Sequence, residues 1–176
     1  MAHFPVTLTK EGPNEQLKSE IHAHIFFYPK GIVHKEFVPS GQTVNQTFYL
    51  QVLECLRNRV VRVRCKIANM WFLHHDNVPS HKSFAVREFL AQHNITMFPH
   101  PPYSPDLAPC NFFSFIKQKA HLKGHHFGTV ENVQAAATRT LNNISSEDFL
   151  HCYEEWQQRW NRCIRSQGAY YERDKL

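Results

Sequence analysis

The sequence predicts an α/β fold, and three observations support this fold class. Two apolar or β-branched runs, residues 21–28 and 32–38, flank a Pro-Lys-Gly turn, which is typical of a β-hairpin. A helical apolar stripe follows, and two short apolar runs then alternate with further helical patterns. A chain of 176 residues fits one domain, and an apolar content of 42% with 14 Phe is sufficient for a core.

The first twenty residues have the least regular pattern. Phe4, Val6 and Leu8 alternate with polar residues, which predicts a short strand. Pro5 argues against a central position for that strand, because proline cannot donate a hydrogen bond to its neighbour.

A long helix is predicted over residues 44–63, where apolar residues recur at helical spacing and Thr43 can cap the first turn. Its C-terminal end is crowded with arginines, namely Arg57, Arg59, Arg62 and Arg64. We interpret them as a solvated face favoured by the helix dipole rather than as a DNA contact.

The second half of the chain alternates strands and helices. Residues 68–75 have the pattern of a buried strand, residues 80–93 of a helix and residues 95–98 of a short strand. Five of the ten prolines lie between Pro99 and Pro109, which predicts a stiff connector. Further helices are predicted over 111–122, over 129–141 and from Ser145, where Asp148 completes a capping box. The aromatic stripe of the last helix predicts core packing rather than a platform for stacked bases.

Two oxygen-bearing side chains stand at the ends of this central stretch. Asp76 ends the strand of residues 68–75, and Asn111 opens a helix 35 positions later. Open α/β sheets place their sites at the carboxyl ends of strands, so the two side chains can meet at one edge of the sheet. Oxygen atoms are the ligands that hard divalent cations prefer.

These motifs closely resemble the catalytic domain of the mariner-type transposases of the Tc1/mariner superfamily. The resemblance lies in His75-Asp76-Asn77, in the run from Pro99 to Cys110 and in Phe112-Phe113, and it extends over residues 21–171. It includes mariner-derived sequences such as the transposase half of a SET-domain methyltransferase fusion, although nothing in this chain resembles a SET domain.

The resemblance implies a ribonuclease H-like fold, with a mixed sheet flanked by helices. In that fold the opening strand lies in the middle of the sheet, beside the strand that carries Asp76. The family cuts and rejoins DNA with three carboxylates that hold two Mg²⁺ or Mn²⁺ ions. Asp76 matches the second acid, and Asn111 stands where most members carry the third Asp, as it does in the methyltransferase fusion.

The first acid of the family has no counterpart in this sequence. Asp76 is the first Asp of the chain, and the acids upstream of the hairpin, Glu11, Glu15 and Glu20, lie in no family-like motif. We therefore expect the opening strand to be missing or replaced, and residues 4–9 to pair poorly with the sheet. The predicted organisation is a divergent N-terminal segment over 1–20, a partial ribonuclease H-like catalytic domain over 21–167 and a C-terminal tail over 168–176.

The resemblance and a net charge of +5 predict DNA as the partner, contacted mainly through its backbone. The candidate contacts are His75, His81, Lys117, Lys119 and Lys123. The alternative for the two histidines is a polar rim around the site.

Two other kinds of site are disfavoured at this stretch. A zinc site of His74, His75, Asp76 and His81 is disfavoured, because adjacent strand residues point to opposite faces. Cys110 lacks the His and acid pattern that activates a nucleophile, so a packed thiol is favoured. The five dispersed Cys indicate reduced intracellular thiols. No apolar run is long enough to span a membrane, and the N-terminus lacks the pattern of a signal peptide.

The function predicted from the sequence is that of a mariner transposase-derived domain. It is related to DNA binding and transposition and is catalytically impaired, with Mg²⁺ or Mn²⁺ binding weakened or lost at Asp76 and Asn111. An active divalent-metal-dependent endonuclease or strand-transfer enzyme is the first alternative, and a non-enzymatic domain that forms a homodimer is the second. The resemblance implies the nucleus as the location.

Overall fold

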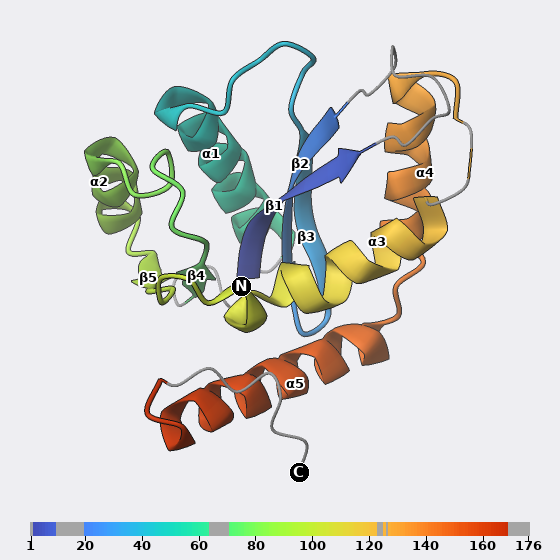
Figure 1. Cartoon of the computed structure of the whole chain (residues 1–176). Coiled ribbons are helices and arrows are strands. Elements are labelled where there is room, and N and C mark those ends of the chain that lie inside the picture. The colour runs from blue at the N-terminus through green and yellow to red at the C-terminus, as the bar shows by residue number, and fades with distance from the viewer. Residues whose placement is uncertain (1, 10–19, 64–70, 123–124, 126, 169–176) are drawn as a thin grey trace.

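One five-stranded sheet organises the protein, and helices cover both of its faces in the computed structural model (Figure 1). The structure describes residues 2–9, 20–63, 71–122, 125 and 127–168. Within these residues, none of the helices combines the length and the apolar character needed to cross a bilayer.

The sheet is mixed, as the resemblance implies. Its strands are β1 (Ala2–Thr9), β2 (Glu20–Tyr28), β3 (Gly31–Phe37), β4 (Phe72–His74) and β5 (Thr96–Phe98), in the order β3-β2-β1-β4-β5. The predicted hairpin is confirmed as β2 and β3, which pair antiparallel, and β4 and β5 run parallel to each other.

The prediction that residues 4–9 pair poorly is wrong. β1 lies in the middle of the sheet and pairs with β2 along its whole length, from Ala2↔Phe27 to Thr9↔Glu20. A vacant centre would leave β2 and β4 with unpaired backbone groups, which is costly in an interior, and the alternating residues of β1 fill that place. Pro5 is tolerated because the described pairing of β1 with β4 is confined to Ala2↔His74.

One face of the sheet is covered by α1 (Gln46–Val63) and α2 (Phe84–Gln92). Its core is formed by Phe26 and Val33 of the hairpin, the apolar stripe of α1, Leu73 of β4 and Leu90 of α2. The helix predicted over 44–63 is confirmed, but its cap is not Thr43. Asn45 takes that role, since its side chain accepts the N–H of Phe48 at 2.9 Å.

The other face is covered by the C-terminal half of the chain. It contains a 3₁₀ turn, η3 (Pro105–Leu107), a π-helical turn, η4 (Cys110–Ser114), and three α-helices, α3 (Phe115–Leu122), α4 (Val130–Asn142) and α5 (Ser146–Arg165). Alternate residues of β2, Ala23, Ile25 and Phe27, pack against this layer. The predicted capping box of Ser145 and Asp148 starts α5.

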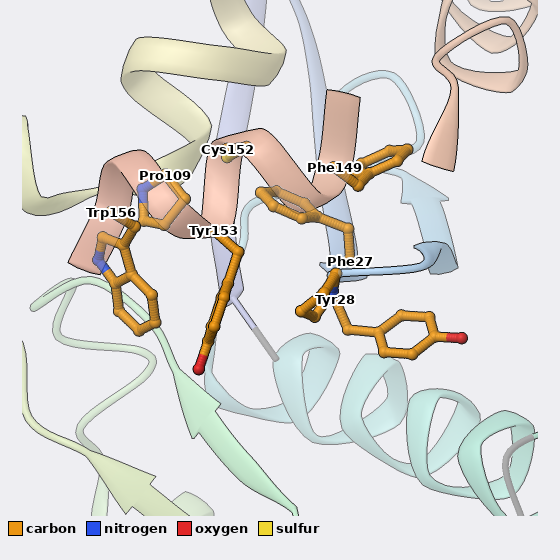
Figure 2. Close-up of a pocket in the computed structure, with 8 residues that line it drawn as sticks. Phe27, Tyr28, Pro109, Phe149, Cys152, Tyr153 and Trp156 are labelled. Carbon is orange, nitrogen blue, oxygen red and sulfur yellow. The ribbon is translucent and has the colours of Figure 1, made fainter. Parts of the chain in front are cut away.

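The aromatic stripe of α5 is core at its start and half-buried further along. Phe149 and Cys152 are buried, and beside them α5 forms a small apolar cleft with the tip of the hairpin (Figure 2). The cleft holds about 30 Å³, far below the roughly 300–1,000 Å³ of ligand pockets. We therefore interpret it as a packing defect between Trp156, Tyr153 and the hairpin rather than as a binding site.

Candidate active site

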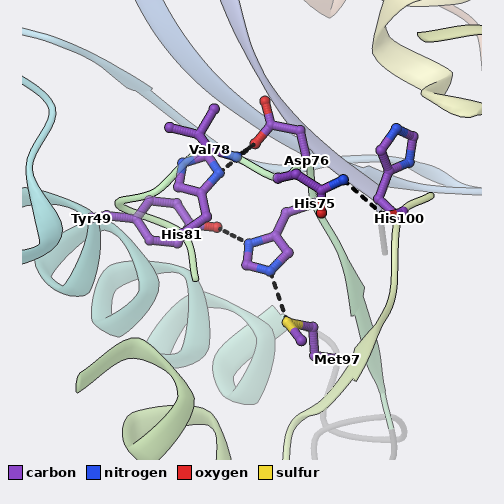
Figure 3. Close-up of polar contacts among 8 residues, drawn as sticks. Tyr49, His75, Asp76, Val78, His81, Met97 and His100 are labelled. Atoms are coloured by element: carbon purple, nitrogen blue, oxygen red, sulfur yellow. Dashed lines mark hydrogen bonds and ion pairs between the residues drawn. The ribbon is translucent and has the colours of Figure 1, made fainter. Parts of the chain in front are cut away.

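Asp76 lies just beyond the carboxyl end of β4, where its side chain is held from two directions. Its Oδ1 atom is 2.6 Å from Nδ1 of His81 and 3.3 Å from the backbone nitrogen of Val78 (Figure 3). Burial would raise the pKa of Asp76, but the hydrogen bond and the charge of His81 outweigh it, so the pKa lies below its usual value. Asp76 is therefore an ionised carboxylate at neutral pH.

His75 turns toward α1, where it is buried beneath Asp76. Its Nδ1 atom is 2.9 Å from the hydroxyl oxygen of Tyr49, and its Nε2 atom is 3.0 Å from the sulfur of Met97 (Figure 3). Burial, followed by the neighbouring His81, lowers the pKa of His75 to about 3, so the ring is neutral. Tyr49 belongs to the apolar stripe predicted over residues 44–63, but the sequence has no signal for this hydroxyl contact across 26 residues.

The predicted DNA contacts of His75 and His81 gain no support from their positions. The two residues are 2% and 0% exposed, so a phosphate does not reach them in this conformation. Their rings stack at 5.3 Å between centroids, and His81 in turn contacts the carboxylate of Asp76.

His74 points to the opposite face of β4 from His75. Its ring centroid lies 5.1 Å from that of Trp156 on α5, and its Nε2 atom is 3.4 Å from Nδ1 of His100. The side chains of His74 and His75 therefore lie on opposite faces of the sheet, because adjacent residues of a strand alternate between its faces. This arrangement separates His74 from His75, Asp76 and His81, the other residues considered for zinc.

Asn111 lies in the first turn of η4, exposed to solvent. Its Nδ2 atom donates to the backbone oxygen of Pro105 over 3.2 Å. η4 contacts β1, which in turn pairs with β4 (Figure 1), so β1 is the neighbour that the two segments carrying Asn111 and Asp76 share. Cys110 is buried in the core, as expected for a packed thiol.

The strand beside Asp76 supplies no acid. β1 and β4 are parallel and pair at Ala2↔His74, so Phe4 is the position of β1 level with Asp76. The whole of β1 reads AHFPVTLT and has neither Asp nor Glu. The place of the opening strand is thus filled, but by a segment without a carboxylate.

The three predicted lysines have different surroundings. The Nζ atom of Lys117 is 2.8 Å from a carboxylate oxygen of Asp148, so its charge is already paired. The Nζ atom of Lys119 lies 4.2 Å from the ring centroid of Phe115. Lys123 lies outside the described residues.

These donors do not fit a centre that holds two divalent ions. Asp76 offers one carboxylate, partly engaged by His81, and Asn111 offers an amide without charge. Nowhere in the part of the chain that the structure describes do three or more His, Cys, Asp or Glu side chains gather as metal ligands would. Paired hard cations need several anionic oxygens to offset their charge, and this site has one such group.

Residues 35–134 match the family model described as DDE superfamily endonuclease. The chain belongs to this family. Within it, the predicted kinship with mariner transposases is confirmed by two curated relatives. The mariner Mos1 transposase of Drosophila mauritiana is 31% identical over 152 residues, which cover 84% of this chain and 44% of that protein. The histone-lysine N-methyltransferase SETMAR of Homo sapiens is 25% identical over 84% of this chain and 22% of its own length. This chain thus spans less than half the length of either relative.

The fold is shared as well. The catalytic domain of Mos1 transposase, solved with Raltegravir and Mn, superimposes with a TM-score of 0.85 at 26% identity, covering 97% of this chain and 84% of that one. The ribonuclease H-like architecture predicted from the motifs is therefore confirmed. The Mn in that structure shows that divalent metals are used in this family.

Proposed function

We propose that this DDE superfamily domain binds DNA without sequence preference and is impaired in phosphoryl transfer. The observation that carries the proposal is the composition of β1. The central strand beside Asp76 contains no acid, and position 111 carries an amide. In-line displacement by two metals needs a clamp of anionic ligands, and one carboxylate is too few to hold both ions.

DNA is the proposed partner because of the family and the charge. Mos1 transposase has been solved as a paired-end complex with a left transposon end. A net charge of +5 gives this chain the attraction to phosphates that non-specific binding needs. The expected dissociation constant is roughly 10⁻⁴–10⁻⁶ M at physiological salt. Such a partner would place the protein in the nucleus.

Cleavage of supercoiled plasmid with Mn²⁺ tests the impairment. We expect the wild-type chain to nick plasmid no faster than Asp76→Ala. Nicking by the wild type that Asp76→Ala abolishes would overturn the proposal and favour the active endonuclease. The one feature in favour of that alternative is that Asp76 is ionised and rigidly held by His81.

A variant that adds a carboxylate tests whether the missing acid of β1 limits metal binding. Phe4→Asp places a second carboxylate at the position level with Asp76, and Phe4→Asn is its neutral control of similar shape. We expect Mn²⁺, followed by electron paramagnetic resonance, to bind Phe4→Asp more tightly than Phe4→Asn or the wild type. Equal binding by all three proteins would show that β1 does not take the place of the acid-bearing strand.

DNA binding is tested separately by filter binding at low and physiological salt. Affinity at low salt that falls steeply as salt is added is expected for backbone contacts. An absence of binding at low salt would remove DNA as the partner and leave the non-enzymatic interaction domain. Sedimentation would then decide whether the chain forms the homodimer which that alternative requires.

A further inference from the structure

Three consecutive backbone oxygens in η3 each accept a hydrogen bond from a side chain elsewhere in the chain. Pro105 accepts from Nδ2 of Asn111 at 3.2 Å, Asp106 from Nη1 of Arg159 at 3.4 Å, and Leu107 from Nε1 of Trp156 at 2.8 Å. Trp156 and Arg159 lie three positions apart on α5, so they project from one side of that helix. We call these three contacts the η3 clasp.

The clasp also fixes the start of η4. The guanidinium carbon of Arg159 lies 4.1 Å from the ring centroid of Phe112, the residue after Asn111. The N–H of Asn111 donates to the oxygen of Ala108 at 2.9 Å, and the N–H of Ala108 donates to Pro105. The proline-rich connector and the helix that follows it are therefore joined at several points within a few residues.

The first contact of the clasp requires an amide at position 111. A backbone oxygen only accepts hydrogen bonds, so the atom that faces Pro105 must be a donor. The Nδ2 group of Asn is such a donor, whereas an ionised carboxylate has none and would place a negative oxygen against another oxygen. The residue that departs from the family's usual Asp is thus the one that this contact can use.

We propose that Asn111 is a positioning residue, which closes the η3 clasp together with Arg159 and Trp156 and so fixes the end of the proline-rich connector. The inference rests on the proposed impairment of the metal site, because it gives position 111 a role that needs no cation. The replacement of a carboxylate by an amide then adds a structural contact at the same time as it removes a charge.

Amide hydrogen exchange tests this role, because it reports on the turn itself. Protection of the N–H groups of Leu107, Ala108 and Asn111 measures how often η3 and its junction with η4 open. We expect exchange there to be about fivefold faster in Asn111→Ala, the effect of one lost hydrogen bond, and faster still in Asn111→Asp. Exchange in α1 should stay unchanged in both variants.

The decisive result is which of the two variants, Asn111→Ala or Asn111→Asp, has the faster exchange in η3. A residue that only fills space at position 111 would tolerate Asp, which has the shape of Asn, better than Ala. The clasp predicts the reverse order, because Asp adds repulsion to the lost donor. Wild-type exchange rates in Asn111→Asp would overturn the proposal.

Three further variants complete the experiment, one as a control and two as tests of the other contacts. Asn58→Asp makes the same chemical change at an exposed position of α1 and should leave exchange in η3 as in the wild type. Trp156→Phe and Arg159→Met remove the other two contacts and should accelerate the same three amides. Exchange unaffected by both α5 variants would contradict the clasp. These outcomes are independent of plasmid nicking and DNA binding, so failure of the clasp and failure of the proposed function are distinguishable.

Discussion

His81 donates its Nδ1–H to the carboxylate of Asp76 over 2.6 Å, and its ring is fully buried beneath that residue. The contact joins the end of β4 to the loop before α2, with Val78 donating to the same oxygen. A half-buried carboxylate such as that of Asp76 benefits from such partners, because burial alone favours its neutral form. His81 is therefore the main contact that holds the pKa of Asp76 below its usual value against the effect of burial.

Replacement of His81 by Phe is expected to raise the pKa of Asp76. The desolvation that raises the pKa would then lack its main opposing contact. Because the folded-state pKa is depressed in the wild type, Asp76 stabilises the fold above its unfolded pKa, and this stability is lost as the pH falls through the folded value. Titration of the Asp76 carboxyl carbon by NMR measures the shift. The carboxyl of Asp148, which is held by Lys117, is the internal control and should not move.

Tyr49→Phe is expected to lower the free energy of unfolding by about 1–3 kcal/mol, because it leaves a buried ring nitrogen of His75 without its hydroxyl partner. Urea denaturation measures the change. Tyr153→Phe is the matched control, since that side chain is exposed and its loss of a hydroxyl should change stability by less than about 0.5 kcal/mol. Equal effects of the two substitutions would show that the contact with His75 contributes nothing.

Gln118→Met is expected to stabilise the protein. Gln118 is fully buried in α3, and neither its Nε2 nor its Oε1 atom has a hydrogen-bond partner within the described structure. A buried polar group without a partner costs about 1–3 kcal/mol, and Met fills a similar volume without that cost. Chemical denaturation should show a higher midpoint, whereas Gln157→Met on the exposed face of α5 should not. A lower midpoint for Gln118→Met would imply a bound water or another partner for the amide.

Mild acid is expected to destabilise the fold through three buried histidines. Burial lowers the pKa of His24 and His75 to about 3 and that of His74 to about 4. The unfolded state therefore binds protons that the folded state does not, from about pH 6.5 down to these values, and stability falls throughout that window. Each such histidine contributes a slope that rises from about zero above pH 7.5 to about 1.4 kcal/mol per pH unit near pH 5, where the unfolded state is protonated and the folded state is not. Urea denaturation between pH 7 and pH 5 measures the total, and His24→Leu should flatten it. A slope that His24→Leu leaves unchanged would show that His24 is not buried in its neutral form.

The elements that could be predicted from the sequence are those with a local signal. The hairpin, α1 and α5 follow from periodicity, turn residues and a capping box that lie within a few positions of one another. The central place of β1 could not be predicted in this way, because it depends on a gap between β2 and β4 rather than on the residues of β1. There the requirement for backbone pairing outweighed the argument from Pro5.

In the candidate site, too, the residues with a local sequence signal could be predicted and those that depend on distant contacts could not. Asp76 and Asn111 were predicted because they belong to long motifs, whereas the roles of their supports depend on contacts between distant residues. Trp156 and Arg159 reach η3 across 49 and 53 positions of sequence. The helix predicted over residues 80–93 begins only at Phe84, with Ser83 as its cap, so His81 lies in the preceding turn, and its pairing with Asp76 is decided by the fold of that turn.

The narrow contact between β1 and β4 has a mechanical consequence. Strands β1, β2 and β3 are fastened to one another by long ladders, but the described join to β4 is the Ala2↔His74 pair. We expect a pulling force or a rise in temperature to separate β4 from β1 before the ladders of the hairpin side open, because far fewer residue pairs join these two strands. Asp76 lies just beyond the end of β4, so this separation would move its carboxylate away from β1 while the hairpin side of the sheet is still folded.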